Sequence, residues 1–312
     1  MGGYNPEKIM LAASETRLSE PQEALYPLLV DRKPRIDMNS FRDLYDVDKD
    51  LAIVREIEEK IKERNRKEGV PESSLKAGEH FELVVDFAID EAGILGPNAT
   101  SKRASRFDDI VGGIDGYVEF EEEGMTFHLA LAMDVTRNTD DISKKFLRNR
   151  TSIDNGELFT GKYYKSDAAH FRGELGHVVR VVLGADQETI DSISDLITRS
   201  LRLSKTIKEN REKGASQEIS AQAKKNLERV NGAIGEHPLQ WIILLEIEQQ
   251  LEIYRMRAEK KNQPEVAEKC GNILAIINAV IAEKKKAGQF ADDEVLLKDR
   301  VFQLIKEELK SF

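Results

Sequence analysis

Two aspartates occupy positions where a pair of carboxylates could bind a divalent cation. Alternating apolar residues predict strands over 112–120 and 126–136, joined by an acidic turn that ends in glycine, which is the pattern of a β-hairpin. Asp115 falls in the first run, and Asp134 stands near the end of the second, where its neighbours are otherwise apolar. Because an unpaired carboxylate is costly in such a place, we expect Asp134 to meet a cation, a metal ion or hydrogen-bond donors.

A third carboxylate completes the predicted site. Glu82 lies at the edge of the apolar stripe of a helix that helical spacing predicts over 73–92, upstream of the hairpin. Carboxylate oxygens are hard ligands that suit Mg²⁺ or Mn²⁺. Three of them around one ion describe a site that can polarise a phosphodiester and activate water. The predicted metal ligands are therefore Glu82, Asp115 and Asp134.

Less specific interpretations of these residues stay open. Glu82 could be only a border residue of an amphipathic helix. Asp115 is followed by glycine, and Asp-Gly is a common turn pair. Asp108 and Asp109 are better interpreted as residues that cap a turn than as ligands. The carboxylates that could nevertheless join or replace the predicted ligands are Glu79, Asp86, Asp108 and Asp109.

The elements that must position these residues follow a simple order. Helical spacing predicts amphipathic helices over 47–68, 73–92 and 140–153, and the β-branched run at 177–185 predicts a buried strand. Residues 1–40 contain four prolines and little periodicity, so we interpret them as an irregular arm. In the second hairpin strand one face is apolar and should be buried against a helix: Leu129, Leu131, Met133 and Val135.

This order, with carboxylates at these positions, resembles the PD-(D/E)XK nuclease superfamily, whose core runs helix, three strands, helix, strand. The first motif of that family is a Glu on a helix that ends in Gly, and GEHFELVVDFAIDEAGI is similar to it through Glu82 and Gly93. The second motif resembles GIDGYVEF at Asp115, and the third resembles LALAMDVT at Asp134. SRFDDIVGGIDGYVEF, LALAMDVT, NGELFTGKYYKS and FRGELGHVVRVVLGAD are also similar to segments of uncharacterised bacterial proteins. The resemblance covers about residues 75–195.

The resemblance implies an α+β fold in which helices flank a small mixed β-sheet, a restriction-endonuclease-like core. The third motif of the family also carries a lysine, and this sequence has Thr136 in its place. Some members supply the lysine from the following helix, where Lys144 and Lys145 stand here. We favour Lys145, because its spacing to Ile142 and Phe146 leaves it beside the apolar face of that helix.

The chain of 312 residues is longer than one compact core usually organises. We expect an N-terminal arm with an amphipathic helix at 1–70, a PD-(D/E)XK-like α/β core at 71–205 and a helical region at 206–312. Beyond about residue 190 the patterns are helical, over 187–210, 217–230, 239–261, 264–284 and 293–309. The apolar seams of the last three could bury one another as a bundle, or they could bind a protein partner or a second copy.

Composition limits the classes of function. A net charge of −10 argues against nonspecific coating of nucleic acid, although local contact with DNA stays open. Basic runs at 60–67, 144–150 and 202–213 could form patches, and solvated helix faces are the favoured interpretation. The single cysteine, Cys270, agrees with a reducing compartment, so the cytoplasm is expected. Apolar stretches are far shorter than the roughly 20 residues that cross a bilayer, so no membrane association is expected.

Two functions from different classes follow. The first is a Mg²⁺- or Mn²⁺-dependent DNA endonuclease, in which Glu82, Asp115 and Asp134 hold the metal and Lys145 or Lys144 orients water. The second is a catalytically inactive protein of nuclease fold that acts as a protein or nucleic-acid interaction module. Thr136 and the acidic net charge favour the second.

Overall fold

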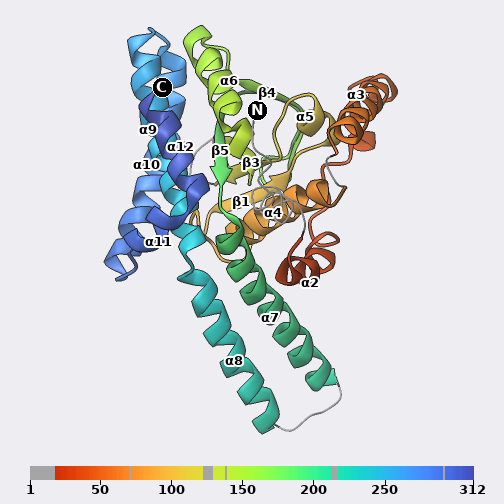
Figure 1. Ribbon diagram of the computed structural model, residues 1–312, viewed down its shortest axis with the longest axis vertical. Helices are drawn as coiled ribbons and strands as arrows, with labels where there is room; N and C mark the ends of the chain where they lie inside the picture. The colour runs from red at the N-terminus through yellow and green to blue at the C-terminus, as the bar shows by residue number, and fades with distance from the viewer. Residues whose placement is uncertain (1–17, 70–71, 122–128, 138, 213–216, 291) are drawn as a thin grey trace, which may run out of the picture.

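The strands gather into one mixed sheet that helices surround. A computed structural model of the protein describes residues 18–69, 72–121, 129–137, 139–212, 217–290 and 292–312. The described chain has an α+β fold (Figure 1). Its strands form a five-stranded sheet in the order β1-β2-β3-β5-β4. They are β1 (Ala99–Arg103), β2 (Gly116–Phe120), β3 (Leu129–Thr136), β4 (Phe159–Ser166) and β5 (Phe171–Gly184).

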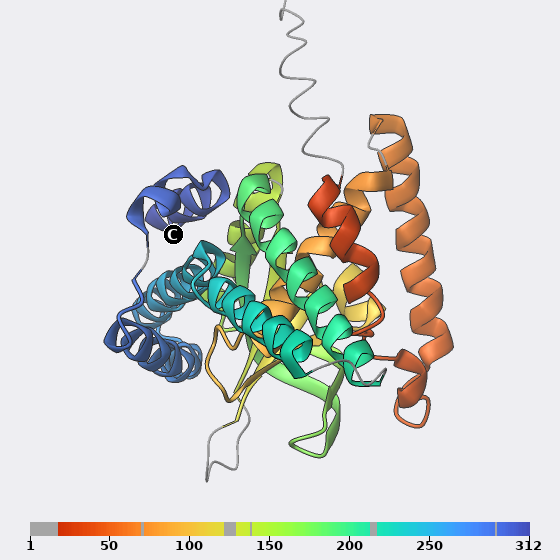
Figure 2. The same ribbon diagram turned by 90° about the horizontal axis from the view of Figure 1, so that it is seen from below.

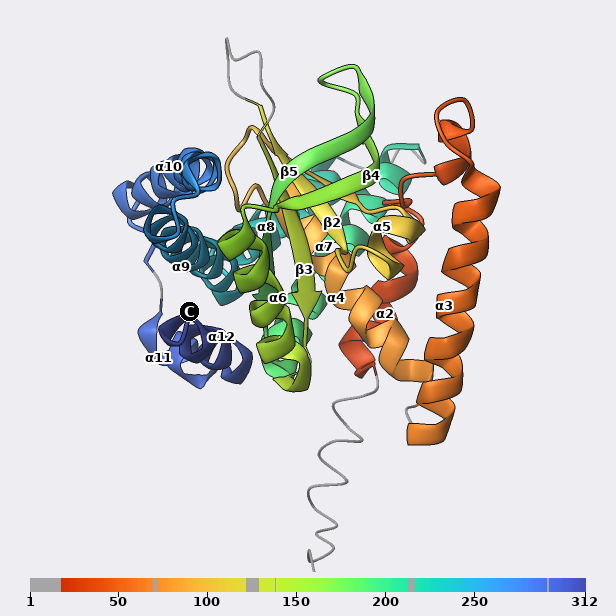
Figure 3. The same ribbon diagram turned by 90° about the horizontal axis from the view of Figure 1, so that it is seen from above.

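The predicted hairpin is confirmed as the antiparallel pair of β2 and β3, in which Gly116 lies opposite Met133. The turn between them lies outside the described residues. β1 adds antiparallel to β2, whereas β3 and β5 run parallel, with Thr136 opposite Gly184. Because parallel neighbours need a crossover, the chain between β3 and β5 passes through α6 (Ile142–Asn155) and β4. β4 pairs antiparallel with the first half of β5, and their hairpin extends beyond the other strands (Figure 3).

Three predicted helices are present with nearly the expected ends. α3 (Val47–Glu68) begins after Asp46, whose side chain accepts from the Lys49 N–H. It ends at Gly69, whose φ of 70° is the left-handed conformation that favours glycine. α4 (Glu72–Asp90) is the predicted helix before the hairpin, and α6 is the predicted helix after it. The predicted helices before and after the hairpin are therefore both present.

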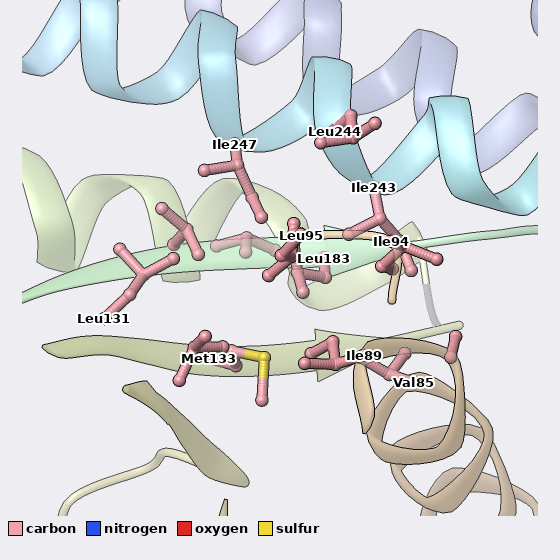
Figure 4. Packing of buried hydrophobic residues seen from close by; sticks show 14 of the residues in the cluster. Val85, Ile89, Ile94, Leu95, Leu131, Met133, Leu183, Ile243, Leu244 and Ile247 are labelled. Carbon is pink, nitrogen blue, oxygen red and sulfur yellow. The ribbon is translucent and has the colours of Figure 1, made fainter. Parts of the chain in front are cut away.

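The main core lies between one face of the sheet and the helices α4 and α9 (Pro238–Lys260) (Figure 4). Leu131 and Met133 on β3 are buried as predicted, and Val135 is partly buried against the same cluster. The side chain of Leu129 lies outside the described residues. Around them pack Val85 and Ile89 of α4, Leu183 of β5, and Ile243, Leu244 and Ile247 of α9.

The opposite face of the sheet carries a smaller cluster that includes Tyr117, Ala132 and Tyr164. Tyr117 lies opposite Ala132 in the ladder, so alternation brings Asp134 to this second face. Ile114 also packs here, although strict alternation predicts it on the other face. The reason is that β2 begins only at Gly116, so the residues before it are not bound by the strand period.

Side chains of helix α9 form hydrogen bonds with the edge of β5 that β4 does not cover. β4 covers only the first half of β5, which leaves edge groups beyond it without a strand neighbour. Gln250 accepts from the Val182 N–H at 2.8 Å and donates to the Val182 carbonyl at 2.7 Å. Glu246 accepts from the Gly184 N–H at 2.9 Å. The seam of α9 therefore packs on the sheet as well as on α10 (Pro264–Lys286), instead of forming only a bundle.

Several expectations are corrected by the structure. Within the predicted irregular arm, α2 (Glu20–Leu29) is a helix. It forms because Pro21 stands in its first turn and Ser19 and Gln22 make a capping box. It packs on α4 and α7 (Gln187–Glu212). The predicted helix over 293–309 is two helices, α11 (Asp293–Lys298) and α12 (Arg300–Lys310), since buried Asp299 starts a new cap there. Leu297 is consequently 67% exposed and not part of a seam. The elements that had not been predicted are β1, α5 (Arg106–Ile110), β4 and the short 3-10 helices Met38–Phe41 and Thr139–Asp141.

The remaining helices give the molecule its outline. α7 and α8 (Gln217–Gly235) form a long hairpin that projects below the sheet in Figure 1. α3 lies on one outer side, and α9, α10 and α12 lie on the other (Figures 2 and 3). The main core draws residues from α2, from 71–205 and from the C-terminal helices, and α7 continues past residue 205. The three-part division of the chain stays a prediction. Among the described helices, none combines the length and the apolar character needed to span a bilayer.

Truncating Leu183 to alanine should destabilise the fold, because its side chain is fully buried between the sheet and α9. We expect Leu183→Ala to lower the free energy of unfolding by about 2–5 kcal/mol, measured by urea denaturation. Leu147→Ala is the matched control, because Leu147 is 63% exposed, and it should change stability by less than about 0.5 kcal/mol. Equal effects of the two variants would contradict this packing.

Glu246 gives the fold a pH dependence. Burial raises the pKa of Glu246 well above its usual range; the nearby Asp299 raises it further, and the Gly184 N–H opposes the shift. Because the pKa of Glu246 is higher in the folded than in the unfolded chain, its protonated form stabilises the fold. This contribution is complete below the unfolded pKa, about 4.3, and is lost as the pH rises towards the folded pKa. Glu246→Gln should therefore gain stability over the wild type with rising pH, by at most about 1.4 kcal/mol per pH unit. The exposed control Glu252→Gln should show a flat difference in denaturation series across pH 4–8.

Candidate active site

Asp115 and Asp134 meet where the hairpin ladder begins. The Asp115 N–H, just ahead of β2, donates to the Met133 carbonyl at 2.8 Å. The Asp115 side chain accepts from the Val135 N–H at 2.6 Å. Since Gly116 lies opposite Met133, the register places Asp115 beside Asp134. The two predicted carboxylates are thus brought together by strand pairing.

Asp134 is held by two cations from the crossover helix α6. Its side chain is only 6% exposed, and its two oxygens accept from Lys145 and Arg148, one each. Lys145 also donates to the Val135 carbonyl at 3.4 Å, and Arg148 donates to the Gly113 carbonyl at 3.3 Å. Residues three apart on a helix share a face, so both cations reach the same carboxylate. The expectation that buried Asp134 meets a cation is therefore confirmed, by Lys145 and Arg148.

Lys144 and Lys145 point in different directions. Neighbouring residues on a helix project about 100° apart. Lys145 turns towards the sheet and is 20% exposed, whereas Lys144 is 78% exposed and pairs with Asp141 at 2.7 Å. Of the two candidate lysines, the structure brings only Lys145 to the carboxylates.

Glu82 is placed by α4 but is engaged by arginines. Arg35 approaches its carboxylate at 3.0 Å and Arg103 at 3.4 Å. The same Arg35 guanidinium also lies 2.9 Å from Asp109. Arg35 belongs to the segment after α2, which lies along the outer edge of β1, where the Ile36 N–H donates to the Arg103 carbonyl at 3.2 Å. Part of the predicted irregular arm, at Arg35, therefore contacts the candidate site.

Two of the other nearby carboxylates, Glu79 and Asp108, have partners outside the predicted site, and a third, Asp109, shares a cation with Glu82. Glu79 accepts from Tyr26 at 2.5 Å and from Arg103 at 2.8 Å, so it faces the N-terminal segment. Asp108 accepts from Ser105 in the cap of α5 and also from backbone N–H groups of β4, which joins the two elements. Asp109, by contrast, shares Arg35 with Glu82 and belongs to the cluster.

These carboxylates influence one another electrostatically. Burial raises the pKa of Asp115 well above its usual range, and the neighbouring charges of Glu82, Asp134 and Asp109 raise it further, while Lys145 opposes them. Burial likewise raises the pKa of Glu82, against the attraction of Arg35. The site is thus a cluster of acids in a desolvated place, balanced by cations from 30–37, β1 and α6.

One further cation, Arg180, borders the cluster beside Arg148. Arg180 of β5 lies beside Ala132 in the parallel ladder, and so it is on the sheet face of Asp134. It donates to the Gly112 carbonyl at 3.1 Å, next to the Gly113 carbonyl that Arg148 contacts. Burial and the charge of Arg148 lower the pKa of Arg180 to about 10. Two guanidinium groups held side by side repel each other and would be stabilised by an anion.

The three predicted ligands do not converge on one point. Within the described residues, no three His, Cys, Asp or Glu side chains are arranged so that they could hold a metal ion together. Glu82 turns to Arg35 and Arg103, while Asp134 turns to Lys145 and Arg148. Glu82 and Asp134 are therefore each paired with basic side chains of the protein and do not share a common centre.

Sequence reasoning missed Arg148, Arg103 and Arg35. Arg148 could have been found, because it follows Lys145 by three residues on a predicted helix. Arg103 lies on a strand too polar and too short to give an alternating pattern. Arg35 carries no local signal, since its contact with Glu82 spans 47 residues of sequence. No family model, no curated protein and no solved structure matches this chain. The description of the fold and of the candidate site therefore depends on the structure of this chain alone.

Replacing Lys145 by methionine should weaken the fold more than the same change at Lys144. Lys145→Met leaves the buried Asp134 with Arg148 alone, so we expect a loss of about 1–2 kcal/mol. Lys144→Met removes an exposed pair and should cost less than about 0.5 kcal/mol. Chemical denaturation at pH 7 measures both, and an equal loss in the two variants would contradict the placement of Lys145.

Proposed function

We propose that this protein hydrolyses phosphodiester bonds in DNA with the help of Mg²⁺ or Mn²⁺. The observation that carries the proposal is the meeting of Asp115 and Asp134 at the end of a hairpin, with Lys145 from the crossover helix on Asp134. Buried carboxylates beside a lysine are an arrangement that costs free energy and is typical of functional sites. The proposal places the protein in the cytoplasm, in agreement with its single cysteine.

The element order supports a restriction-endonuclease-like core. α4, β1, β2, β3, α6 and β5 follow one another as helix, three strands, helix and strand, which is the order of the PD-(D/E)XK core that the sequence motifs resemble. α5 and β4 are additions between these elements. Glu82, Asp115 and Asp134 fall on the first helix, before the second strand and on the third strand, as the resemblance implies.

The donor set suits a hard divalent cation. Asp115 and Asp134 offer carboxylate oxygens from neighbouring strands, and Glu82 would join them once Arg35 and Arg103 release its carboxylate. The mutual repulsion of these acids is relieved by any cation that enters among them. When bound, the ion would supply Lewis-acid polarisation of a phosphate oxygen and lower the pKa of bound water.

The cations of the site give the chain its own part in the reaction. The Lys145 ammonium, on Asp134, would hold the attacking water and offset the negative charge that develops on the phosphate. Arg148 and Arg180 would bind the non-bridging oxygens of the same phosphate, since both guanidinium groups border this sheet face. Together they orient an anionic substrate against the carboxylates.

A second candidate is a non-catalytic interaction module that keeps this fold. The observation that favours it is that Glu82 and Asp134 are already paired with protein cations, so the cluster is balanced without a metal. Thr136 stands where the resembling family has lysine. The C-terminal helices would then supply the surface for a protein partner or a second copy.

Mn²⁺ binding separates the two candidates. We expect the wild type to bind Mn²⁺, observed as loss of the free-ion signal in electron paramagnetic resonance, and to cleave plasmid and linear DNA in its presence. Asp134→Ala should lose both properties, because it removes one of the two converging carboxylates. Asp167→Ala is the matched control, since Asp167 is exposed in the turn after β4, and it should retain both.

Lysine variants test the catalytic assignment within the same assay. Lys145→Met should reduce the cleavage rate by about a hundredfold or more at a temperature where it remains folded, while Lys144→Met should cleave normally. A wild type that binds no Mn²⁺ and leaves single-stranded, duplex and branched DNA intact would reject the enzyme and support the interaction module. Normal cleavage by Lys145→Met would reject the assigned role of Lys145.

A further inference from the structure

The hairpin of α7 and α8 has a charge opposite to that of the whole chain. Residues 199–229 contain nine Lys and Arg but only four Asp and Glu, which is a net charge of +5 in a protein whose net charge is −10. The described residues among them, 199–212 on α7 and 217–229 on α8, form the distal part of the hairpin, which projects from the body of the molecule in Figure 1. We call these described residues, 199–212 and 217–229, the basic arm.

The cations of the basic arm cover its outer surface. Five on α7 recur at every third residue, and because a helix turns about 100° per residue, each lies about 60° behind the one before. They therefore wind around the side of α7 that faces away from α8, whereas Leu203 and Ile207 are half-buried on the inner side. All of the following are exposed: Arg199, Arg202, Lys205, Lys208, Arg211, Lys224, Lys225 and Arg229.

In the other two basic runs of the chain most cations are paired with carboxylates, whereas in this one few are. On α3, three of the five cations in the run pair with a glutamate within one helical turn, at 2.6–2.8 Å: Lys60, Lys62 and Lys67. The run on α6 is engaged by the acids of the candidate site and its surroundings. In the described part of the basic arm, carboxylate partners are found only for Arg199, at 2.6 Å, and for Lys205, at 3.9 Å.

Helix α7, whose distal half belongs to the basic arm, begins at the sheet end that carries the candidate site. β5 runs parallel to β3, with Thr136 opposite Gly184, and α7 starts directly afterwards at Gln187. Arg137, which follows β3, donates to Gln187. The 26 residues of α7 extend about 39 Å, a little more than one turn of duplex DNA, about 34 Å. A duplex bound at the candidate site could therefore run along the arm.

The composition of the hairpin favours a duplex over other polyanions. Residues 187–235 contain no Phe, Tyr or Trp, and single strands are usually bound by stacking their bases on aromatic side chains. A helix that lies on an anionic membrane exposes a large apolar face, and no large apolar side chain is exposed in the described part of the arm. Phosphate contacts by Lys and Arg alone suit the regular backbone of a double helix.

We propose that the basic arm binds the phosphate backbone of double-stranded DNA and positions it for the candidate site. This inference rests on the proposed function, because it assigns the form of the nucleic acid that the site would receive. The contact is independent of base sequence, since no reading of base edges is involved.

Binding in the absence of metal tests this proposal. Fluorescence anisotropy with a labelled duplex of about 30 base pairs, in EDTA and ~0.1 M salt, measures the affinity of the wild type and of Arg202→Gln/Lys208→Gln/Arg211→Gln. The matched control removes three charges from α3 in Lys60→Gln/Lys62→Gln/Lys67→Gln. Glutamine has nearly the helix propensity of lysine and arginine, so both triple variants should fold.

The arm variant should bind the duplex at least about tenfold more weakly, and the slope of log affinity against log salt should fall by about two to three. The control should bind as the wild type does. Equal binding by the two triple variants would overturn the proposal, and so would equally tight binding of a single strand or of anionic phospholipid vesicles. Loss of duplex binding in the arm variant, in a protein that never cleaves DNA, would reject the proposed function and leave the arm assignment intact. If the arm variant instead cleaves DNA and binds the duplex as the wild type does, the arm assignment is rejected and the proposed function is kept.

Discussion

The parallel pairing of β3 and β5 is the constraint on which the site depends. Parallel neighbours cannot be joined by a tight turn, so the chain must cross over the sheet before β5 begins. The crossover brings α6 beside the end of β3, and with it Lys145 and Arg148 to the only acidic residue of that strand, Asp134. Because both strands end at the same edge, α7 also begins there. Strand direction thus determines which cations reach the carboxylates.

Charge balance is the second organising principle. A desolvated group of acids destabilises a fold unless cations or hydrogen-bond donors compensate it. Here compensation comes from three directions: the segment 30–37 through Arg35, β1 through Arg103, and α6. The segment 30–37 is held along β1 by backbone and side-chain bonds, among them Lys33 to the Ser101 carbonyl at 2.9 Å. It both covers an open sheet edge and delivers a charge to Glu82.

Periodicity was sufficient to predict the helices α3, α4 and α6 and the hairpin of β2 and β3, because each has one apolar face. It was insufficient for β1 and β4, whose sequences ATSKR and FTGKYYKS lack regular alternation and are strands because neighbours pair with them. The carboxylates of the site could be chosen from the sequence, since acidic residues interrupt otherwise apolar elements there. Arg35 could not, because only tertiary contact brings the end of the α2 segment to α4. Prolines at 21 and 27 concealed α2, although one of them stands in its first turn.

Thr136 occupies the position at which the superfamily that the motifs resemble has a lysine, and in this chain an ammonium group reaches Asp134 from Lys145 of α6 instead. Asp134 and Thr136 stand two residues apart on β3 and therefore share a face, so a lysine at 136 would approach the carboxylate from within the strand. This end of the strand is crowded: Thr136 is buried, and α12 packs over Gly184 opposite it, where Val301 and Ile305 occupy the space that a Cβ on the glycine would need. A long charged side chain there would have little access to water, whereas Lys145 reaches Asp134 from α6 and remains 20% exposed. An ammonium group within reach of the buried Asp134 carboxylate compensates its charge, and a helix position supplies that group at a lower cost of desolvation than the buried strand position would.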